Sequence, residues 1–420
     1  MLKKYNVEVK SEIGELEAVI LHTPGSEVEN MTPKNAERAL YSDILNLAVA
    51  QKEYSQFKAV LDKHTKTFQV KDLLTEILNN DRVKESLIDE IFLSENVDES
   101  KDFMLSLSNK ELARQLIEGV EMKKDNLTKY FSKERYSLRP LHNFFFTRDA
   151  SMSIMNEVLI GRMASRVRDR ESKIMQAIFD YHPNFNAKTI NSIQEPCFNE
   201  QINIEGGDVL VAREDILLIG TGARTSYQGI DFIIEQFKKT KQKMHIIVQE
   251  LPHTPESFIH LDMVFTFIDK DICMVYEPLI LKPNKYHTVH IYIDNGKILI
   301  NQEVNIIEAL KKLGMSLKPV FCGGKKDIWI QEREQWHSGA NFFAMAPGKI
   351  IGYSRNVNTI EELNKNGFEV IKARNIMNDK VDLTKLNKYV VTIEGSELSR
   401  GGGGARCMTM PVKRKAVNWK

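Results

Sequence analysis

Short runs of apolar residues alternate with polar segments along most of the chain. Several runs are rich in Val and Ile and are bounded by glycine, proline or polar residues, which is typical of buried β-strands. The runs cover residues 18–21, 209–212, 216–219, 245–248, 272–276 and 389–393. Apolar residues at helical spacing separate several of them, over residues 170–181, 229–238 and 305–313. This alternation predicts an α/β fold.

One stretch departs from that alternation. From residue 34 to residue 139 the chain has no proline and a single glycine, Gly119. Apolar residues recur there at helical spacing, for example at Val83, Leu87, Ile88 and Ile91. Ser108 and Glu111 stand three residues apart ahead of an apolar stretch, which indicates a capping box at a helix start. This part of the chain is therefore expected to be helical.

The helical stretch also suggests how the chain is divided. Thr32 followed by Pro33 is typical of a cap and a first helical residue, so we expect a long helix over about residues 33–63. We expect a helical subdomain over residues 71–139. The flanking segments, 1–70 and 140–420, would together form the α/β domain.

Composition and charge narrow the class of protein. The chain has 420 residues, 58 basic against 57 acidic and a formal net charge of +1, so it lacks the basic excess expected of a nucleic-acid-binding protein. No stretch approaches the roughly 18 apolar residues of a membrane span, and the start lacks the apolar core of a signal peptide. Four cysteines without a CxxC pair do not indicate a disulfide framework. A cytoplasmic protein is expected.

Polar residues recur at intervals that suggest a repeated unit. Asp149, Glu205, His260, Asn341 and Arg400 are separated by about 55 to 60 residues, with one interval of about 81. Such spacing is typical of copies of one supersecondary unit, each presenting a polar residue from an equivalent loop. Copies arranged around an axis would bring these residues to one central cavity.

Three short motifs carry candidate catalytic side chains. Asp149 follows an apolar run and an arginine, and Glu205 and Asp208 flank two glycines that allow a tight turn and a close approach. His260 and Asp262 lie in an apolar segment and would share one face of an extended strand. A strand end, a plain turn and a structural histidine explain the motifs almost as well one at a time. The His-x-Asp pair is the one that favours a functional site.

The C-terminal segment contains the fourth motif. Four consecutive glycines, from residue 401 to 404, are entropically costly and favour a backbone that passes close to a ligand or bends sharply. Cys407 follows them, next to Arg406, and a neighbouring cation would favour the thiolate form that acts as a nucleophile. The other cysteines have no such setting and are interpreted as packing residues.

Taken together, these groups suit one kind of substrate. A thiol, a histidine and several carboxylates form an acidic site, and paired carboxylates match the planar donors of a guanidinium ion. Attack on the central guanidinium carbon is difficult because resonance stabilises it. A thiolate nucleophile and fixed opposite charges are the chemistry that such a reaction needs.

With Asp149, Glu205-Gly-Gly-Asp208, His260-Leu-Asp262 and Cys407-Met-Thr-Met-Pro in place, the chain closely resembles bacterial arginine deiminases of the guanidino-modifying (pentein) superfamily. The resemblance spans nearly the whole chain and includes the Ser-Glu-Ile-Gly stretch near the N-terminus. It implies a five-bladed α/β propeller of ββαβ units around a pseudo-fivefold axis, with the helical subdomain inserted. It also implies hydrolysis of L-arginine to L-citrulline and ammonia, the first step of the arginine deiminase pathway.

The resemblance further implies a role for each reacting residue. Cys407 would attack the guanidinium carbon and form a covalent amidino-cysteine intermediate, while Asp149 and Asp262 would hold the guanidinium nitrogens. His260 would protonate the departing ammonia and then activate water. Glu205 would orient His260 and keep it protonated. No metal and no organic cofactor are implied, and a homo-oligomer is expected.

At the other end of the substrate, Asn143, Arg168 and Arg224 occupy the positions of the family's carboxylate-binding residues. Cationic donors there favour an α-carboxylate, and they disfavour agmatine, which has none. One departure from the family pattern concerns the glycine-rich loop, because some members have an arginine at the position of Gly402 that is proposed to gate the site.

Three alternatives remain open at this point. The first is a hydrolase for a decarboxylated or N-methylated guanidine. The second is a metallohydrolase that uses His260, Asp262, Glu205 and Asp208, although closely spaced histidine motifs are missing from the sequence. The third is a protein that binds arginine without catalysis.

Overall fold

The computed structural model describes residues 4–31, 43–95, 97, 101–194, 202–240 and 242–419. The expected cap at Thr32 and Pro33 and the cysteine at position 197 lie outside the described residues. So does the first part of the helix expected over 33–63. Within the described part, that helix is α3 (Leu47–His64), which begins later than expected because the Asn46 side chain caps it by accepting a hydrogen bond from Val49 N at 3.1 Å.

Five of the sheets in the described residues repeat one arrangement. A central strand pairs antiparallel with one neighbour and parallel with another, and the crossover to the parallel neighbour contains helix. With the central strand in the middle of each set, the strands are β22 (Met410–Arg414), β2 (Leu16–Leu21) and β3 (Lys66–Gln69); β6 (Ser151–Ile154), β7 (Glu157–Ile160) and β9 (Lys188–Ile190); β10 (Val209–Arg213), β11 (Ile216–Thr221) and β12 (Met244–Glu250); β13 (Phe265–Phe267), β14 (Ile272–Val275) and β17 (Lys318–Phe321); β18 (Phe343–Ala346), β19 (Lys349–Tyr353) and β21 (Tyr389–Ile393).

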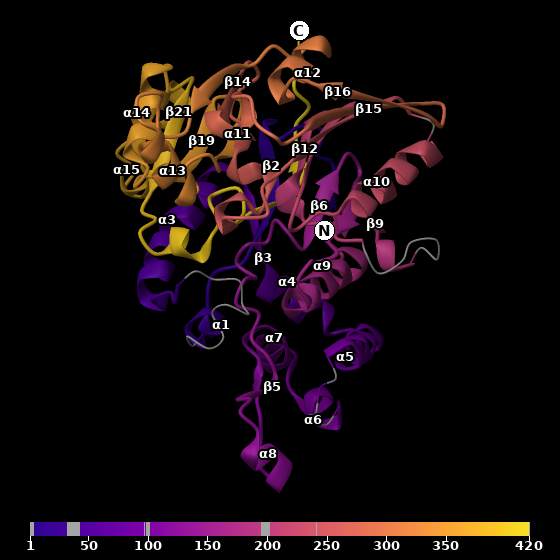
Figure 1. The fold of residues 1–420 in the computed structure, drawn as a ribbon. Coiled ribbons are helices and arrows are strands. Elements are labelled where there is room, and N and C mark those ends of the chain that lie inside the picture. Colours follow the sequence, from indigo (N-terminus) through magenta and orange to yellow (C-terminus); the bar gives the residue numbers. More distant parts are fainter. Residues whose placement is uncertain are drawn as a thin grey trace.

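Further strands extend two of these sheets or form small pairs. They are β15 (Thr288–Asp294) and β16 (Lys297–Glu303), which continue the β10-β11-β12 sheet, β20 (Glu369–Lys372) beside β21, and the pairs β1 (Tyr5–Asn6) with β8 (Phe185–Asn186) and β4 (Val120–Glu121) with β5 (Tyr136–Leu138). The two ends of the chain meet, because β22 pairs with β2. Figure 1 shows the sheets in the upper part of the molecule.

The apolar runs identified in the sequence lie in these strands, as predicted. Each of the six runs falls within β2, β10, β11, β12, β14 or β21 apart from one residue at the end of β14. The central strands are buried on both faces, and Ile216, Leu217, Leu218 and Ile219 of β11 have no exposed surface. Continuous apolar runs, rather than alternating ones, are what such doubly covered strands require. The α/β assignment is confirmed at this level.

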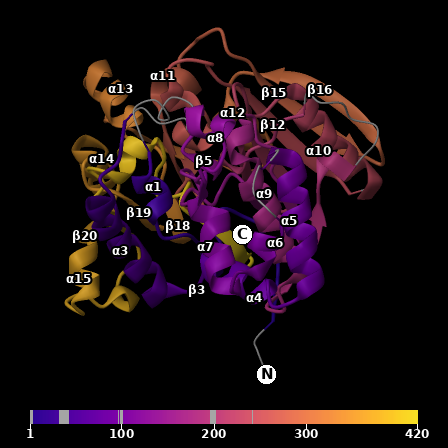
Figure 2. The same ribbon diagram turned by 90° about the horizontal axis from the view of Figure 1, so that it is seen from below.

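Helices cover the sheets and form an extension below them (Figures 1 and 2). The helices besides α3 are α1 (Ser26–Glu29), α4 (Val70–Ile77), α5 (Asp81–Glu95), α6 (Lys101–Ser106), α7 (Asn109–Glu118), α8 (Leu127–Phe131), α9 (Asp169–Tyr181), α10 (Tyr227–Thr240), α11 (Glu277–Ile280), α12 (Ile306–Lys312), α13 (Ile328–Trp336), α14 (Val357–Lys365) and α15 (Ala373–Met377). No helix in the described part of the chain is long and apolar enough to cross a bilayer.

The extension is made by α5 to α8 and the β4–β5 hairpin (Figure 1). The apolar residues predicted to face inward on α5 are buried, and the side chain of Ser108 caps α7 by accepting a hydrogen bond from Glu111 N at 3.3 Å. Of these helices, α5, α6 and α7 share one apolar core with α4, α9 and strands of the first two sheets, whereas α8 has no buried residue. The region predicted to be helical therefore also contains a hairpin. The domain limits of 71 and 139 stay a prediction.

Candidate active site

Polar residues stand at equivalent places in the five repeated sheets. In each sheet, one of them lies in the loop just before the strand that pairs antiparallel with the central strand. These residues are Asp149 before β6, Glu205 before β10, Asp262 before β13, Asn341 before β18 and Cys407 before β22. A repeated polar position was expected, and Asp149, Glu205 and Asn341 stand at it. In the third unit Asp262 takes the position instead of the expected His260, which lies two residues earlier. In the last unit Cys407 takes it instead of the expected Arg400, which lies partly exposed and paired with Asp43 and Glu397.

These loops surround one pocket. Its lining includes Asn143, Asp149, Arg168, Arg224, His260 and Cys407. Glu205 and Asp262 are fully buried and contact pocket residues from behind. The structure thus brings together every residue that the sequence analysis selected for the site.

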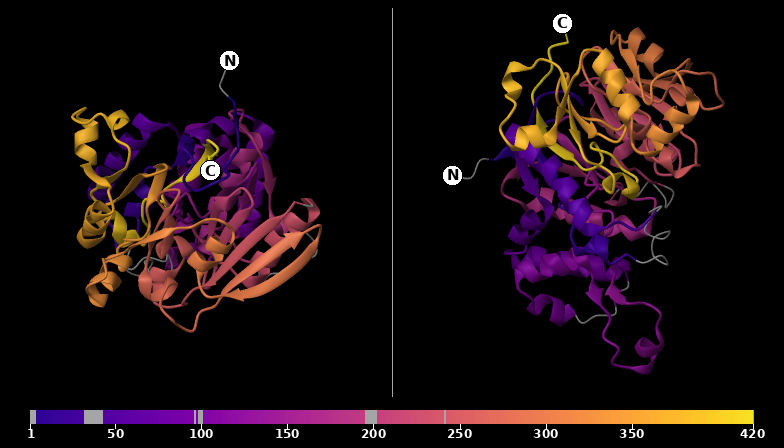
Figure 3. Two further views of the ribbon diagram at one scale, coloured as in Figure 1. Left: turned by 90° about the horizontal axis from the view of Figure 1, so that it is seen from above. Right: turned by 90° about the vertical axis from the view of Figure 1, so that its left-hand side faces the viewer.

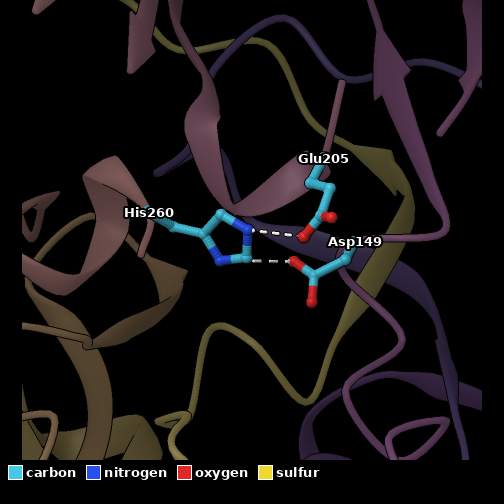
Figure 4. Close-up of side chains that lie close together, drawn as sticks. All are labelled: Asp149, Glu205 and His260. Carbon is cyan, nitrogen blue, oxygen red and sulfur yellow. Dashed lines mark hydrogen bonds and ion pairs between the residues drawn. The ribbon is translucent and has the colours of Figure 1, made fainter. Parts of the chain in front are cut away.

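The imidazole ring of His260 faces two carboxylates, those of Glu205 and Asp149, as Figure 4 shows. Its Nε2 is 2.9 Å from Oε2 of Glu205, and its Nδ1 is 3.7 Å from Oδ1 of Asp149. Burial disfavours the imidazolium, but the charge of Asp149 and the hydrogen bond that the ring donates to Glu205 outweigh it and raise the pKa of His260 to about 9. The imidazole is therefore charged at neutral pH. Gly207 lets it sit there, because a Cβ at that residue would lie 2.4 Å from Nδ1.

Glu205 is a buried carboxylate that stays ionised. Burial raises its pKa, but the hydrogen bond with His260 and the charges of Arg224 and Arg168 lower it to about 2. Nη1 of Arg224 lies 3.8 Å from Oε1 of Glu205, and Nη1 of Arg168 lies 4.0 Å from Oε2. Ala164 N also donates to Oε1 at 3.0 Å. A permanently charged acid at this place keeps the imidazolium in position.

The Cys407 thiol contacts an amide and a carboxylate. Asn341 donates its Nδ2–H to Sγ at 3.2 Å, and Sγ lies 3.7 Å from Oδ2 of Asp262. Burial, followed by the negative charges of Asp262 and Asp149, holds the pKa of the thiol well above its usual range. The protein alone therefore favours the neutral thiol.

The expected effect of Arg406 on the thiol is present but is outweighed. The charge of Arg406 lowers the pKa of the Cys407 thiol, by less than burial and the charges of Asp262 and Asp149 raise it. The guanidinium donates from Nε to Oε2 of Glu12 at 2.9 Å and from Nη1 to Oδ2 of Asp262 at 2.8 Å, so that two acids share this cation. The same oxygen of Asp262 lies 3.7 Å from Sγ.

Comparison with known proteins decides the family. Residues 37–414 match the family described as arginine deiminase. The arginine deiminase of Bacillus cereus (strain ATCC 10987 / NRS 248) is 33% identical to this chain over 99% of the chain and 100% of the relative. That of Listeria monocytogenes serotype 4b (strain CLIP80459) is 33% identical over 97% and 98%. The chain belongs to the arginine deiminase family.

The fold is similar to that of other guanidino-modifying proteins. A DDAH from Pseudomonas aeruginosa, solved with citrulline, has a TM-score of 0.51 at 13% identity and covers 94% of this chain and 99% of its own. An amidinotransferase from Microseira wollei has a TM-score of 0.52 at 13% identity, with 98% of both chains covered. At such low identity these likenesses concern the α/β pentein fold alone.

For an arginine deiminase family member, the position of Arg168 is unexpected. The sequence analysis placed it at the carboxylate end of the substrate. Here its Nη1 donates to Oδ2 of Asp149 at 2.8 Å, and its Nη2 donates to Oε2 of Glu171 at 2.8 Å. The side chain lines the pocket, yet it is held by the aspartate expected to bind the guanidinium.

Two residues around the thiol were given no catalytic or binding role from the sequence. Asn341 is one: besides Sγ, its Nδ2 donates to the carbonyl of Asp262 at 3.1 Å, and its Oδ1 accepts from Arg406 N at 2.8 Å and Cys407 N at 3.4 Å. Gly404 permits this, since a Cβ there would be 2.5 Å from that oxygen. Glu12 is the other. The repeat spacing contained the signal for Asn341, and the N-terminal motif contained Glu12.

A metal ion is a poor fit to the same residues. Among the described residues, Asp149, Glu205 and His260 are the set close enough to share an ion. Asp149 already contacts Arg168, and Glu205 lies near both Arg168 and Arg224. Two guanidinium groups beside the ligands would repel a divalent cation. The alternative ligand set with Asp262 and Asp208 is not gathered at one point.

Proposed function

We propose that this protein hydrolyses L-arginine to L-citrulline and ammonia, the first step of the arginine deiminase pathway. The observation that carries the proposal is the shared pocket of Cys407, a protonated His260 and the acids Asp149 and Asp262. Family membership supports it independently. The substrate guanidinium would lie between the two aspartates, each of which can accept two of its hydrogen bonds.

The substrate itself would activate the thiol. Burial and the charges of Asp262 and Asp149 hold the thiol pKa high, so a cation placed between those acids removes two of the three causes. The thiol proton has Asp262 as its nearest carboxylate, 3.7 Å away. Asn341 then donates its N–H to the thiolate, and Sγ attacks the guanidinium carbon.

His260 would act twice. As an imidazolium it gives a proton to the departing nitrogen, so that ammonia leaves and an amidino group remains on Sγ. The neutral imidazole then takes a proton from water, which attacks the same carbon and releases citrulline and the thiol. Glu205 raises the proton affinity of the imidazole in this second step, because its carboxylate accepts the 2.9 Å hydrogen bond from Nε2. These steps use only groups of the chain and water.

At the outer end of the substrate, Arg224 and Asn143 would bind the α-carboxylate, together with Arg168. Arg224 has one long ion pair in the described residues, 3.8 Å to Glu205, and it lines the pocket. Arg168 would reach the carboxylate once the substrate guanidinium takes over Asp149. The arrangement favours arginine over agmatine, which offers no carboxylate.

We also propose that the five repeated sheets form the blades of an α/β propeller around a pseudo-fivefold axis, with residues 71–139 inserted after the first blade. Two observations support this: the shared strand arrangement, and one polar residue contributed by each sheet from an equivalent loop. An experimentally determined structure in which the five sheets are not related by successive rotations about one axis would contradict it.

The test of function is citrulline and ammonia formation from L-arginine. Cys407→Ser is expected to abolish both products, whereas Cys273→Ala, which alters a buried thiol on β14 outside the pocket, is expected to keep them. Turnover by Cys407→Ser would remove the thiol mechanism. Faster hydrolysis of agmatine than of arginine would overturn the carboxylate assignment, and loss of activity on exhaustive chelation would revive a metal mechanism.

A further inference from the structure

Strand β16 is an edge strand with an unusual exposed surface. In the part of the chain that the structure describes it pairs with β15 on one side and with nothing on the other. Its first six residues are exposed, including Ile298 at 40%, Leu299 at 56% and Ile300 at 60%. The opposite edge of the same sheet, β10, is almost fully buried. The β15–β16 hairpin lies along the outside of the molecule (Figure 3).

The usual protections of a sheet edge are missing from the middle of β16. Proteins shield such edges with proline, with charged side chains or with bulges that twist the strand away. The pairing of β15 with β16 runs without a register shift, and the charges stand only at the two ends, at Lys297 and Glu303. The aliphatic centre of the strand is therefore free to accept another strand.

The hairpin turn fixes which backbone groups point outward. Asn295 and Gly296, with φ of 48° and 78°, form a two-residue turn that joins the paired residues Asp294 and Lys297. In such a hairpin the residues flanking the turn bond each other, and alternate residues then face the two neighbours. The outward N–H and C=O groups are therefore those of Ile298, Ile300 and Gln302.

We propose that β16 pairs antiparallel with β16 of a second copy of this chain, about a two-fold axis at Ile300. In that register Ile298 faces Gln302 of the partner subunit, and Ile300 faces its own counterpart. All three outward-facing positions then stand opposite outward-facing positions, which allows about six hydrogen bonds. If the axis passed through a neighbouring residue instead, the two residues that face each other at the axis would not be outward-facing ones. Fewer residues of the two strands would then overlap.

The side chains agree with this register. Leu299 lies next to the partner's Asn301, and Lys297 lies opposite Glu303, so that no like charges meet. The Glu303 side chain is only 6% exposed and already contacts Lys312, so the strand register carries the pairing and no new ion pair is needed. The result is one continuous sheet of ten strands, five from each copy.

The size of the contact predicts a reversible dimer. A single strand pair covers less than the roughly 1,200–2,000 Å² of a stable interface. The homo-oligomer expected from the family resemblance gains here a defined surface. The pocket lies elsewhere in the molecule, so each copy should work alone, and the inference does not depend on the proposed function.

The test is the mass in solution over a range of protein concentrations, by light scattering or sedimentation. The wild-type chain should be a dimer at tens of micromolar and dissociate on dilution. Ile300→Lys should be monomeric, because the two-fold axis places the two lysines opposite each other. Ile300→Glu should be monomeric for the same reason, since two glutamates would face each other. A mixture of the two variants should dimerise again. Val304→Lys, at an 81% exposed residue just after the strand, is the matched control and should dimerise normally.

Several outcomes would overturn the proposal. They are a wild-type chain that stays monomeric at these concentrations, a dimer that persists in Ile300→Lys, or a mixture of the charged variants that remains monomeric. Citrulline formation per chain, measured on the same samples, should be equal in all variants. Loss of activity in the wild type would concern the proposed function and leave the dimer assignment untouched.

Discussion

Two buried arginines hold the two aspartates of the pocket, and their surroundings differ. Arg406 bridges Asp262 and Glu12, while Arg168 bridges Asp149 and Glu171. Each is therefore a cation between a pocket aspartate and a glutamate behind it. Arg168 lines the pocket, but Arg406 does not.

The two glutamates show what separates the pairs. Burial raises the pKa of Glu12, but Arg406, with help from Arg148 and Arg414, outweighs burial and lowers it to about 2. At Glu171 burial prevails over the single neighbouring Arg168, and the pKa rises to about 7. The Glu12 cluster has a fixed charge at any physiological pH. The Glu171 pair can gain a proton near neutrality, which would suit the proposed exchange of partners by Arg168.

The largest difference is expected in stability. Glu12→Ala leaves three buried arginines without their shared acid and should lower the free energy of unfolding by about 3–5 kcal/mol. Glu171→Ala should cost less than half as much, because Arg168 keeps Asp149 at 2.8 Å. Urea denaturation of both variants at pH 7 measures this. Equal losses would mean that the two pairs are equivalent.

The second prediction concerns substrate binding. Arg168→Ala should reduce kcat/KM for arginine by about 100-fold, mainly through KM, because a buried ionic contact to substrate is lost. If Arg168 binds the carboxylate, hydrolysis of agmatine falls much less. If Arg168 serves only to hold Asp149, kcat/KM falls equally for arginine and agmatine. Measuring both substrates therefore separates these two roles.

Asn341 tests the thiol side of the site. Asn341→Ala removes the N–H donated to Sγ at 3.2 Å and should lower kcat about tenfold, since a hydrogen bond to a charged group is worth roughly 1.5 kcal/mol or more. Activity should also need a higher pH, because the thiolate loses its donor. Asn341→Gln, which keeps the amide, is the matched variant. An unchanged pH profile in Asn341→Ala would mean that Asn341 does not stabilise the thiolate and has only a structural role.

The last prediction concerns the pH dependence of stability. Because the folded state raises the pKa of Glu171 from 4.5 to about 7, its stabilising contribution is complete below pH 4.5 and is lost as the pH rises to 7. For Glu12, lowered to about 2, the contribution is complete above pH 4.5 and is lost as the pH falls to 2. Glu171→Gln should flatten the stability curve between pH 4.5 and 7 by roughly 3 kcal/mol. Thermal unfolding at several pH values would show whether the slope persists.

Sequence patterns predicted the strands because apolar runs report burial. The reacting residues Asp149, Glu205, His260, Asp262 and Cys407 came from motifs with a chemical reason, whereas Asn143, Arg168 and Arg224 were chosen by family resemblance. Contacts that depend on side-chain direction were not predicted. Glu12 and Asp262 hold the guanidinium of Arg406, and Asp149 and Glu171 hold that of Arg168. The β15–β16 hairpin and its uncovered outer strand were not predicted either, because a sequence pattern does not show which sheet edges stay unpaired.

The pairing of β22 with β2 has a consequence for the order in which the protein is made. Glu12 and Arg406 are 394 positions apart, so a ribosome delivers the acid long before its cation. Until Arg406 is made, Glu12 lacks its hydrogen-bonded cation, and the first sheet lacks strand β22. The thiol follows Arg406 by one residue. A growing chain therefore completes its first sheet and gains Cys407 only after the strands of the other four repeated sheets have been made.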